Sequence, residues 1–388
     1  MPDADTSVTR PALVESDESL RAFCATLSGA SYLALDTEFV RVRTYYPELC
    51  LIQVAAPDGL ACIDPLAWER LPAAIPQNVA LAPLLDLLHD PASVKVMHAG
   101  RQDLELFYLL DGRLPAPLFD TQIAAAMLGF DDQVGYAKLV ESLLGITLEK
   151  AHTRTDWAER PLSAEQLAYA AEDVQHLVTL YERLRARLEE RGRLAWLEED
   201  AQALLDPSLY RVVPEDMWQR VKGYANLRSP AQRAALEKLA AWREREAMSR
   251  NRPRQWVLRD PLLLAIARAM PTSRQRLAQV PELPRPVVER YSEVLLELVD
   301  SARDATTPGH PSLEPTDTEQ ANRLVAVVRE CAARNDLSPS LIAPRRELTQ
   351  LLRGERDLAL LRGWRLELIG RELLGLADSL KGRSAPAA

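Results

Sequence analysis

The segment Tyr32-Leu-Ala-Leu-Asp36-Thr-Glu38 constrains this chain more than any other, because a strand-like apolar run ends there in two carboxylates. Side chains of a β-strand alternate between faces, so Asp36 and Glu38 would lie side by side on one face of a sheet. Two adjacent acids repel each other unless a cation sits between them. The segment therefore predicts a metal site. An Asp-x-Glu triplet is short and common, however, so for the pair alone a solvated strand end or a helix cap is the alternative.

A further acid follows a second strand-like run. The sequence from Val94 to Phe107 has the pattern of a strand, a glycine-containing turn and the opening of a helix, with Asp103 in the first helical turn. The positive end of the helix dipole stabilises an anion at this position. Capping of the helix is the simpler interpretation of Asp103 when it is considered by itself.

The long helical pattern Ala164–Glu190 contains the last acid of interest, Asp173. Tyr169 lies four residues earlier, so its hydroxyl and the Asp173 carboxylate share one helix face. The neighbouring apolar stripe consists of Leu167, Ala170, Val174 and Leu177. Asp173 should therefore point toward the domain interior, where an acid needs a partner, and a metal ion would supply one.

Residues 1–205 are predicted to form an α/β domain. Strand-length apolar runs come first, at Tyr32–Leu35, Leu49–Ala55, Leu60–Ile63 and Val94–His98. Helical patterns follow, at Leu104–Leu110, Thr121–Leu128, Tyr136–Leu144 and Ala164–Glu190. Strands followed mainly by helices indicate a mixed sheet flanked by helices.

The rest of the chain shows helical patterns. Ser229 is the expected cap of a helix that opens with Pro230, and further helices are predicted at Asp260–Met270, Arg285–Val299, Glu319–Arg334, Pro344–Leu352 and Gly363–Ser379. Prolines and a glycine make 303–316 a predicted linker. The expected organisation is an α/β domain over 1–205 and two small helical domains over 212–302 and 317–388.

Charge is distributed unevenly along the 388 residues. The whole chain carries a net charge of −9, yet residues 218–290 hold sixteen Lys and Arg against six Asp and Glu. A basic segment within an acidic chain indicates a nucleic-acid partner, and a merely solvated helical surface is the alternative.

The cysteine pattern and the hydropathy of the chain indicate its cellular compartment. The four cysteines are scattered without a CxxC or Cys/His cluster, which argues against a structural zinc and a disulfide framework. The N-terminus lacks a signal-peptide pattern, and no apolar stretch approaches ~18 residues. We expect a cytoplasmic protein that does not span a membrane.

Taken together, three motifs resemble those of the DEDDy 3′–5′ exonucleases: Asp36-Thr-Glu38-Phe, His98-Ala-Gly-Arg-Gln-Asp103-Leu and Tyr169-Ala-x-x-Asp173-Val. Phe119-Asp-Thr-Gln-Ile-Ala and Asp156-Trp-x-x-Arg-Pro-Leu extend the resemblance to the ribonuclease D family, closely over about residues 30 to 190. Three weak motifs in the right order make a strong signal together. The resemblance implies an RNase H-like exonuclease fold.

The helical part resembles the HRDC domain (helicase and RNase D C-terminal). Its motifs are Leu236-x-x-Leu-x-x-Trp242-Arg-Glu-x-x-Ala247, then Asn251-x-Pro and Val257-Leu-x-Asp260. Residues 317–388 would be a second, more divergent HRDC-like copy, argued mainly from position and helical pattern.

The resemblance also implies a mechanism. Two divalent ions, Mg²⁺ or Mn²⁺, would bind the acids. Asp36 would be shared, Glu38 and Asp173 would hold the ion that activates water, and Asp103 would serve the second ion through water. Tyr169 would orient the attacking water. The implied reaction releases nucleoside 5′-monophosphates from the 3′ end of structured RNA such as precursor tRNA, by a monomer that needs no protein partner. The alternatives are a DNA 3′–5′ exonuclease and a catalytically silent RNA-binding module.

Several basic or polar residues are candidates for contacts with RNA phosphates: Arg101, Gln102, Arg243, Arg250, Arg252 and Arg254. Other conspicuous residues have simpler expected roles. We predict a satisfied turn or core residue at His98, a helix cap at Asp120, a core anchor at Trp157, and packing at Trp242 and Trp256.

Overall fold

The computed structural model describes residues 11–69, 76–148, 155–306 and 318–383. Its residue contacts divide the chain into two units. The first unit comprises residues 1–39, 49–210 and 315–388, and the second comprises 40–48 and 211–314. Most of the linker predicted over 303–316 lies outside the described residues. The predicted three-part division of the chain stays a prediction.

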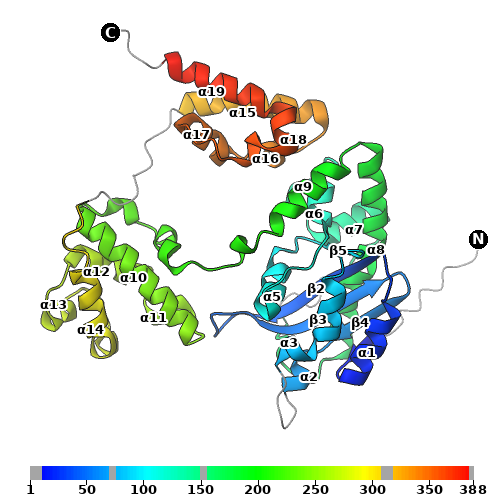
Figure 1. Ribbon diagram of the computed structural model, residues 1–388, viewed down its shortest axis with the longest axis horizontal. Helices are drawn as coiled ribbons and strands as arrows, with labels where there is room; N and C mark the ends of the chain where they lie inside the picture. Colours follow the sequence, from blue (N-terminus) through cyan, green and yellow to red (C-terminus); the bar gives the residue numbers. More distant parts are fainter. Residues whose placement is uncertain (1–10, 70–75, 149–154, 307–317, 384–388) are drawn as a thin grey trace, which may run out of the picture. The chain divides into compact units, whose positions relative to one another are not determined.

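A six-stranded mixed sheet forms the centre of the first unit, with strand order β1-β4-β3-β2-β5-β6 (Figure 1). The strands are β1 (Ala12–Val14), β2 (Tyr32–Val40), β3 (Glu48–Ala56), β4 (Gly59–Ile63), β5 (Val94–Met97) and β6 (Leu118–Asp120). Strands β2, β5 and β6 run parallel, and β3 runs antiparallel to β4. The mixed sheet predicted from the sequence is confirmed.

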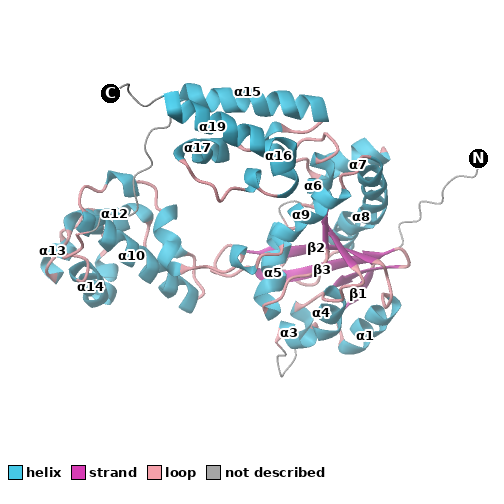
Figure 2. Cartoon of the chain, turned by 45° about the horizontal axis from the view of Figure 1, so that its top comes forward, coloured by secondary structure: helices cyan, strands magenta, loops and turns pink. Residues whose placement is uncertain are grey.

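Helices cover both faces of this sheet (Figure 2). One face packs on α6 (Thr121–Ala126), α7 (Tyr136–Leu144), α8 (Ala164–Glu190) and α9 (Leu194–Leu204). The other face packs on α1 (Asp17–Thr26), α3 (Gln77–Ala80), α4 (Ala82–Leu88) and α5 (Arg101–Asp111), near the short α2 (Leu66–Glu69). The helices predicted at Tyr136–Leu144 and Ala164–Glu190 have the expected bounds.

A second group of helices belongs to the same unit as the sheet. These are α15 (Thr318–Asn335), α16 (Pro339–Ile342), α17 (Arg345–Arg353), α18 (Gly363–Arg365) and α19 (Arg371–Arg383), with a π-helical turn at Leu366–Gly370. Their buried apolar side chains join the core cluster that contains those of α8 and α9. Trp364 stacks on Trp196 of α9, with ring centroids 4.7 Å apart. These helices are thus packed directly on the α/β domain.

The second unit contains α10 (Pro230–Ser249), α11 (Arg254–Val257), α12 (Asp260–Ala269), α13 (Arg274–Ala278) and α14 (Arg285–Asp300). Ser229 caps α10 as predicted, because its hydroxyl accepts from the Gln232 N–H and the Gln232 side chain returns the contact. The loop 40–48 between β2 and β3 also belongs to this unit. Across the described residues, no helix is both long and apolar enough to cross a membrane.

Candidate active site

Strand β2 places two acids toward α8. Tyr32 and Ala34 belong to the core on the α8 side of the sheet, whereas Leu33 belongs to the core on the opposite side. Alternation along the strand continues the first series through Asp36 and Glu38. Both acids are partly exposed, at the end of β2 where the core gives way to solvent.

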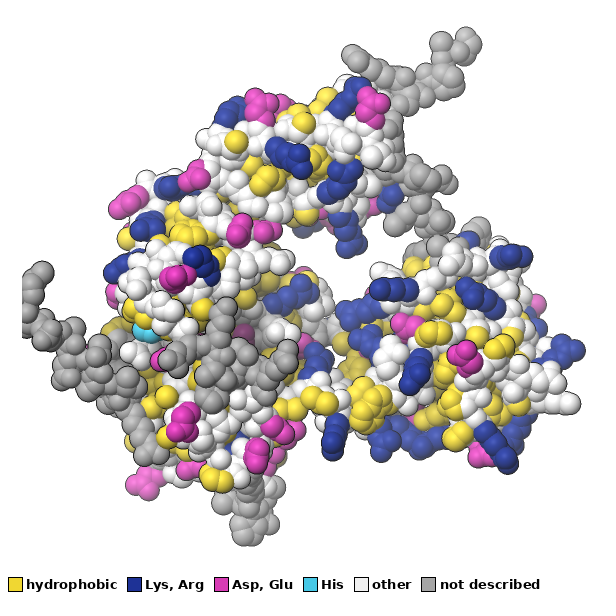
Figure 3. All heavy atoms as spheres, turned by 180° about the vertical axis from the view of Figure 1, so that it is seen from behind, with side chains coloured by type: hydrophobic (Ala, Val, Ile, Leu, Met, Phe, Trp, Pro, Cys, Tyr) yellow, Lys and Arg dark blue, Asp and Glu magenta, His cyan; other side chains and the backbone are white. Residues whose placement is uncertain are grey.

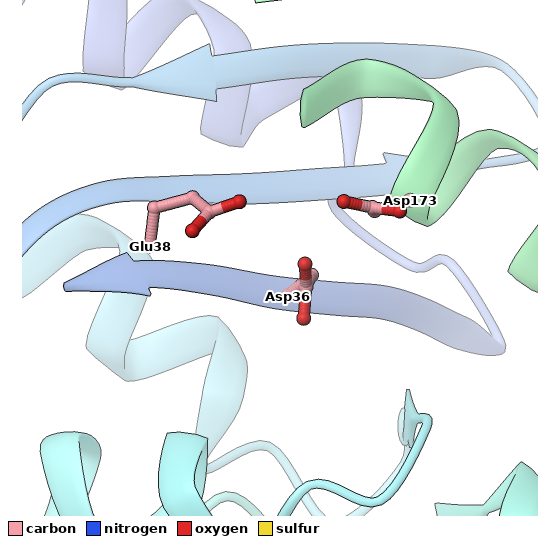
Figure 4. A group of neighbouring side chains, drawn as sticks. All are labelled: Asp36, Glu38 and Asp173. Atoms are coloured by element: carbon pink, nitrogen blue, oxygen red, sulfur yellow. The ribbon is translucent and has the colours of Figure 1, made fainter. Parts of the chain in front are cut away.

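Helix α8 supplies the third acid. Ser163 caps the helix and forms a capping box with Gln166, which fixes where the helix begins. The predicted apolar stripe is buried against the sheet, as shown by Leu167, Ala170, Val174 and Leu177. Asp173 lies among the residues of this stripe, partly buried, with its carboxylate beside Asp36 of β2 (Figure 4).

The three carboxylates converge on one point. Asp36, Glu38 and Asp173 each offer an oxygen, and these oxygens all lie within 4.8 Å of one another (Figure 4). A cluster of hard oxygen donors of this kind fits Mg²⁺ or Mn²⁺ better than a softer metal. The donor set therefore fits a divalent ion.

Asp103 lies outside this group of three carboxylates, beside Thr37 of β2. It is buried in the first turn of α5 and accepts a hydrogen bond from the Thr37 hydroxyl. Thr37 alternates with Asp36 and Glu38 along β2, so it faces away from them. The structure thus brings Asp103 to the site's edge rather than into the group of three.

Burial raises the pKa of every acid at the site, and repulsion by the other acids of the site adds to it at Asp36 and Glu38. Burial is the main cause at Asp36, whose pKa lies well above its usual value, and Asp103, Asp173 and Glu38 raise it further. Burial and the charges of Asp173 and Asp103 raise the pKa of Glu38 to about 8. Burial raises the pKa of Asp173 to about 7 and that of Asp103 to about 6. Glu38 therefore holds its proton at neutral pH, and Asp173 holds its proton in part, unless a cation offsets their charges.

Tyr169 lies one turn before Asp173 on α8, half-buried, with its ring stacked on Trp157 at a centroid distance of 6.3 Å. Burial raises its pKa, and the charges of Asp173 and Glu38 raise it further. Its hydroxyl therefore stays protonated at neutral pH. Trp157 is buried, as predicted for a core anchor.

Tyr136 at the start of α7 is a neighbour that the sequence did not reveal. Its hydroxyl donates to the Glu172 carbonyl at 2.9 Å, and burial, with the charges of Asp173 and Asp36, raises its pKa. No local pattern marks this tyrosine, because its proximity to the site depends on the packing of α7 against α8.

Arg160, the arginine of the Asp156-Trp-x-x-Arg-Pro-Leu motif, fixes the segment that leads into α8. Its guanidinium forms a buried ion pair with Asp64 at 2.7 Å and donates to the carbonyl of Cys50 at 2.6 Å. It also donates to the Trp157 carbonyl at 2.5 Å. Arg160 thereby ties this segment to β3 and to the end of β4.

The simple interpretations of His98 and Asp120 are confirmed. His98 contacts the Thr121 hydroxyl at 2.9 Å and the Val134 carbonyl at 3.0 Å through its two ring nitrogens. Asp120 caps α6 by accepting from the backbone N–H of Gln122. These contacts account for both side chains without a role in the acidic site.

The candidate RNA contacts differ in accessibility. Arg101 and Gln102 are exposed in the first turn of α5, directly before Asp103. Arg252 is exposed, whereas Arg250 pairs with Glu246 and Arg254 lies 3.7 Å from Glu244. Their roles toward RNA stay predictions.

The structure contradicts the prediction that Arg243 contacts RNA phosphates. Its side chain is 1% exposed, pairs with Asp260 at 2.5 Å and donates to the Leu258 carbonyl at 3.0 Å. It lies on the face of α10 that packs inside its unit, so it stabilises the fold and cannot reach a phosphate.

Of the two tryptophans predicted to pack in this unit, only Trp242 does so. It lies half-buried against Tyr291 with ring centroids 5.0 Å apart. Trp256 is 61% exposed, so its predicted packing role is wrong. Its neighbour Val257 is the residue of α11 that faces the core.

Comparison with known proteins agrees with this geometry. The family model described as a 3′–5′ exonuclease matches residues 11–189, and that of the HRDC domain matches residues 232–299. The fold and the acidic site define a 3′–5′ exonuclease with an HRDC domain.

Close relatives specify the family. Ribonuclease D of Granulibacter bethesdensis is 42% identical over 95% of this chain and 93% of its own length. Ribonuclease D of Gluconacetobacter diazotrophicus is 43% identical over 95% of this chain and 93% of its own length. The crystal structure of Escherichia coli RNase D, described as an exoribonuclease involved in structured RNA processing, covers 96% of this chain and 99% of its own with a TM-score of 0.85 and 33% identity. This chain belongs to the ribonuclease D family and is a 3′–5′ exoribonuclease.

Proposed function

We propose that this exoribonuclease shortens structured RNAs, precursor tRNA among them, from the 3′ end. The observation that carries the proposal is the convergence of Asp36, Glu38 and Asp173 within 4.8 Å of one another. Hydrolysis breaks the bond between phosphorus and the 3′ oxygen of the preceding nucleotide. The oxygen of water joins the phosphorus, so a nucleoside 5′-monophosphate leaves and a new 3′-hydroxyl remains.

The acids are the proposed holders of two divalent ions, Mg²⁺ or Mn²⁺. Asp36, Glu38 and Asp173 offer converging oxygens. Asp103 accepts a hydrogen bond from Thr37, the residue between Asp36 and Glu38 on β2. When bound, such ions stabilise the attacking and the leaving oxygen of a displacement at phosphorus. The raised pKa values support this assignment, since Asp36, Glu38 and Asp173 lie so close that they need positive charge to ionise together.

Tyr169 is proposed to orient the attacking water. Its raised pKa keeps the phenol protonated at neutral pH, so it acts as a hydrogen-bonding group and not as a general base. Stacking on Trp157 limits where the hydroxyl can point. Loss of the hydroxyl should therefore lower kcat more than it changes KM.

Contacts to the RNA backbone are proposed for Arg101 and Gln102 beside the site, and for Arg250, Arg252 and Arg254 in the second unit. Such contacts position a strand without reading its sequence. We further propose that the enzyme acts as a monomer in the cytoplasm.

Digestion of a 3′-extended tRNA with Mg²⁺ tests the function. Wild-type protein should shorten the RNA stepwise and release nucleoside 5′-monophosphates, while Asp36→Asn should abolish shortening. Asp58→Asn is the matched control, because Asp58 is an exposed carboxylate in the turn between β3 and β4. Equal rates for wild type and Asp36→Asn would reject the site.

A DNA strand of the same sequence provides the decisive comparison of substrates. Faster digestion of DNA than of RNA would favour the DNA exonuclease alternative. RNA binding without cleavage of either strand would favour a catalytically silent module.

A further inference from the structure

Gln53 of β3 is a buried polar side chain that the fold leaves unpaired. It is 0% exposed, and neither its Nε2 nor its Oε1 atom has a hydrogen-bond partner among the residues that the structure describes. Buried amides almost always have partners, because a donor or acceptor that leaves water loses its hydrogen bonds to water. An apolar side chain of the same size would therefore stabilise the fold better at this position.

The neighbours of Gln53 along β3 show which face of the sheet it occupies. Ile52 and Val54 belong to the core on the side of α1, α4 and α5. Side chains alternate along a strand, so Gln53 points to the opposite face, which α8 covers. Ala34 of β2 lies in the core on that side, and Asp36 is two residues further along the same strand. Gln53 and Asp36 thus share one face of the sheet.

The position of Gln53 along β3 also brings it close to Asp36. Strands β2 and β3 are neighbours in the sheet, and the segment 41–47 joins the end of one to the start of the other, as in an antiparallel hairpin. Asp36 lies four residues before the end of β2 at Val40, and Gln53 lies five residues after the start of β3 at Glu48. The two residues are therefore roughly opposite each other on strands that lie about 4.8 Å apart.

The other side chains around Gln53 on this face are poor partners for an amide. Cys62 of β4 is paired with Gln53 in the register of the sheet, and a thiol forms only weak hydrogen bonds. The buried stripe of α8 that covers this face is apolar at Leu167, Ala170 and Val174. Among these neighbours, the carboxylate of Asp36 is the strong hydrogen-bonding group.

We propose that Gln53 is a positioning residue of the metal site, whose Nε2 donates a hydrogen bond to Asp36 when that carboxylate holds a divalent ion. A carboxylate offers about four lone-pair directions, so it can bind an ion and accept from an amide together. The hydrogen bond forms by rotation of the two side chains, and it fixes the carboxylate in the orientation that the ion requires. The inference rests on the proposed metal site and deepens it.

Isothermal titration calorimetry of Mn²⁺ into the metal-free full chain tests the inference independently of cleavage. Gln53→Met keeps the length of the side chain and removes the amide, so it should raise the Kd for Mn²⁺ by about tenfold or more. Asp and Glu side chains, magenta in Figure 3, are spread over the surface, so some weak binding is expected in every variant. Asp36→Asn removes a ligand of the site and measures that background.

Thermal unfolding in EDTA separates a role toward the ion from a role in the fold. Gln53→Met should keep the melting temperature or raise it by up to about 2–4 °C, because it removes an unpaired buried amide. Gln53→Leu, a second apolar replacement, should give the same two results. A purely structural role would lower the melting temperature and leave the Kd for Mn²⁺ of the folded protein unchanged.

Ser93→Ala is the matched control. Ser93 is 5% exposed, and within the described part of the chain its hydroxyl also lacks a partner. It directly precedes β5 at Val94, which is paired with Tyr32, so it lies at the opposite end of β2 from Asp36 and Glu38. Its replacement should leave the Kd for Mn²⁺ as in wild type.

A kinetic measurement adds a further readout. At saturating Mn²⁺, Gln53→Met should lower kcat for RNA cleavage about tenfold and leave KM within about twofold, because the buried amide cannot touch the RNA. A rise in KM with unchanged kcat would contradict a role in positioning the acids.

An unchanged Kd for Mn²⁺ in Gln53→Met overturns the inference. A melting temperature well below that of wild type in both apolar variants would show that the amide is needed by the fold, and it would overturn the inference too. If wild type binds no more Mn²⁺ than Asp36→Asn does, the proposed metal site fails and the inference fails with it. If wild type and Asp36→Asn differ while wild type and Gln53→Met agree, the inference alone fails.

Discussion

The two helical regions that follow the α/β domain in sequence differ in what they do with their aromatic and charged residues. In α10–α14 the tryptophan Trp256 is exposed and residues 218–290 are strongly basic. In α15–α19 the tryptophan Trp364 is buried on Trp196, and charges of both signs are nearly balanced over 316–385, with twelve Lys and Arg against ten Asp and Glu.

A largely buried ion pair holds α15–α19 on the α/β domain. Arg365 forms a two-pronged contact with Asp200 of α9 at 2.5 and 2.9 Å, and Trp364 donates to the same carboxylate at 3.1 Å. Arg193 links the α/β domain to α15 by donating to the Asn335 carbonyl at 2.5 Å. In α10–α14, Arg243 forms a similar buried contact with Asp260, but it lies within its own unit, and Arg252 is exposed. Similar helical sizes therefore do not imply similar roles.

The largest expected difference between the regions is in stability. Trp364→Ala removes a buried, stacked ring and should lower the free energy of unfolding by about 3–5 kcal/mol. Trp256→Ala should change it by less than about 0.5 kcal/mol, because the ring is exposed. Thermal unfolding by circular dichroism measures both, and equal losses would contradict the comparison.

The acidic site adds a pH dependence to the unit that holds α15–α19. Glu38 has a folded-state pKa of about 8, above its usual 4.5, so the folded chain binds a proton more tightly than the unfolded chain. Stability from this group is full below about pH 4.5 and is lost as pH rises to about 8, at about 1.4 kcal/mol per pH unit for one proton. Urea unfolding in EDTA at several pH values measures the slope.

Glu38→Gln should flatten that slope, and Asp58→Asn should leave it as in wild type, since Asp58 lies in an exposed turn. Mg²⁺ or Mn²⁺ should raise stability most at high pH, because a cation favours the ionised acids. A slope unaffected by Glu38→Gln would show that this carboxyl is not protonated in the folded protein.

A smaller effect is expected from the clamp on α9. Asp200→Ala should lower the free energy of unfolding by about 2 kcal/mol, because the Arg365–Asp200 pair is only 15% and 13% exposed and Trp364 loses its acceptor. Asp357→Ala breaks the exposed pair with Arg362 and should cost at most about 0.5 kcal/mol. Chemical denaturation can rank the two variants, and the reverse order would mean that α15–α19 are not held by this contact.

The smallest expected difference between the two regions is in how RNA affinity depends on salt concentration. Arg252→Gln should reduce the slope of log Kd against log salt for RNA by about one unit if this arginine contacts a phosphate. Arg371→Gln, an exposed arginine of α19, should leave the slope unchanged. Anisotropy titrations at several salt concentrations measure both, and equal slopes for the two variants would argue against a special role for the basic unit.

Much of the fold followed from local patterns. The alternation of β2 and the helical repeat of α8 predicted that Asp36, Glu38 and Asp173 would face one another, and they do. Strands β1 and β6 were missed because each has only three residues, too few for alternation to show.

The burial of individual side chains depended on which faces of the helices pack against each other. Arg243 and Arg252 look alike in the sequence, yet one is buried on Asp260 and the other is exposed. Trp256 and Trp242 are also alike in the sequence, yet Trp242 packs against Tyr291 and Trp256 is exposed. Side-chain burial is decided by contacts between distant segments, which a single sequence does not display.

The sequence by itself determined the acids, their order and the helices and strands that carry them, because strand alternation and helix periodicity act over a few residues. Only the tertiary structure decided that Asp103 is hydrogen-bonded to Thr37, that α15–α19 pack on α9, and that the loop 40–48 is hydrogen-bonded to Asn251. Each of these contacts joins segments far apart in the chain, so its formation depends on long-range packing and not on local propensity.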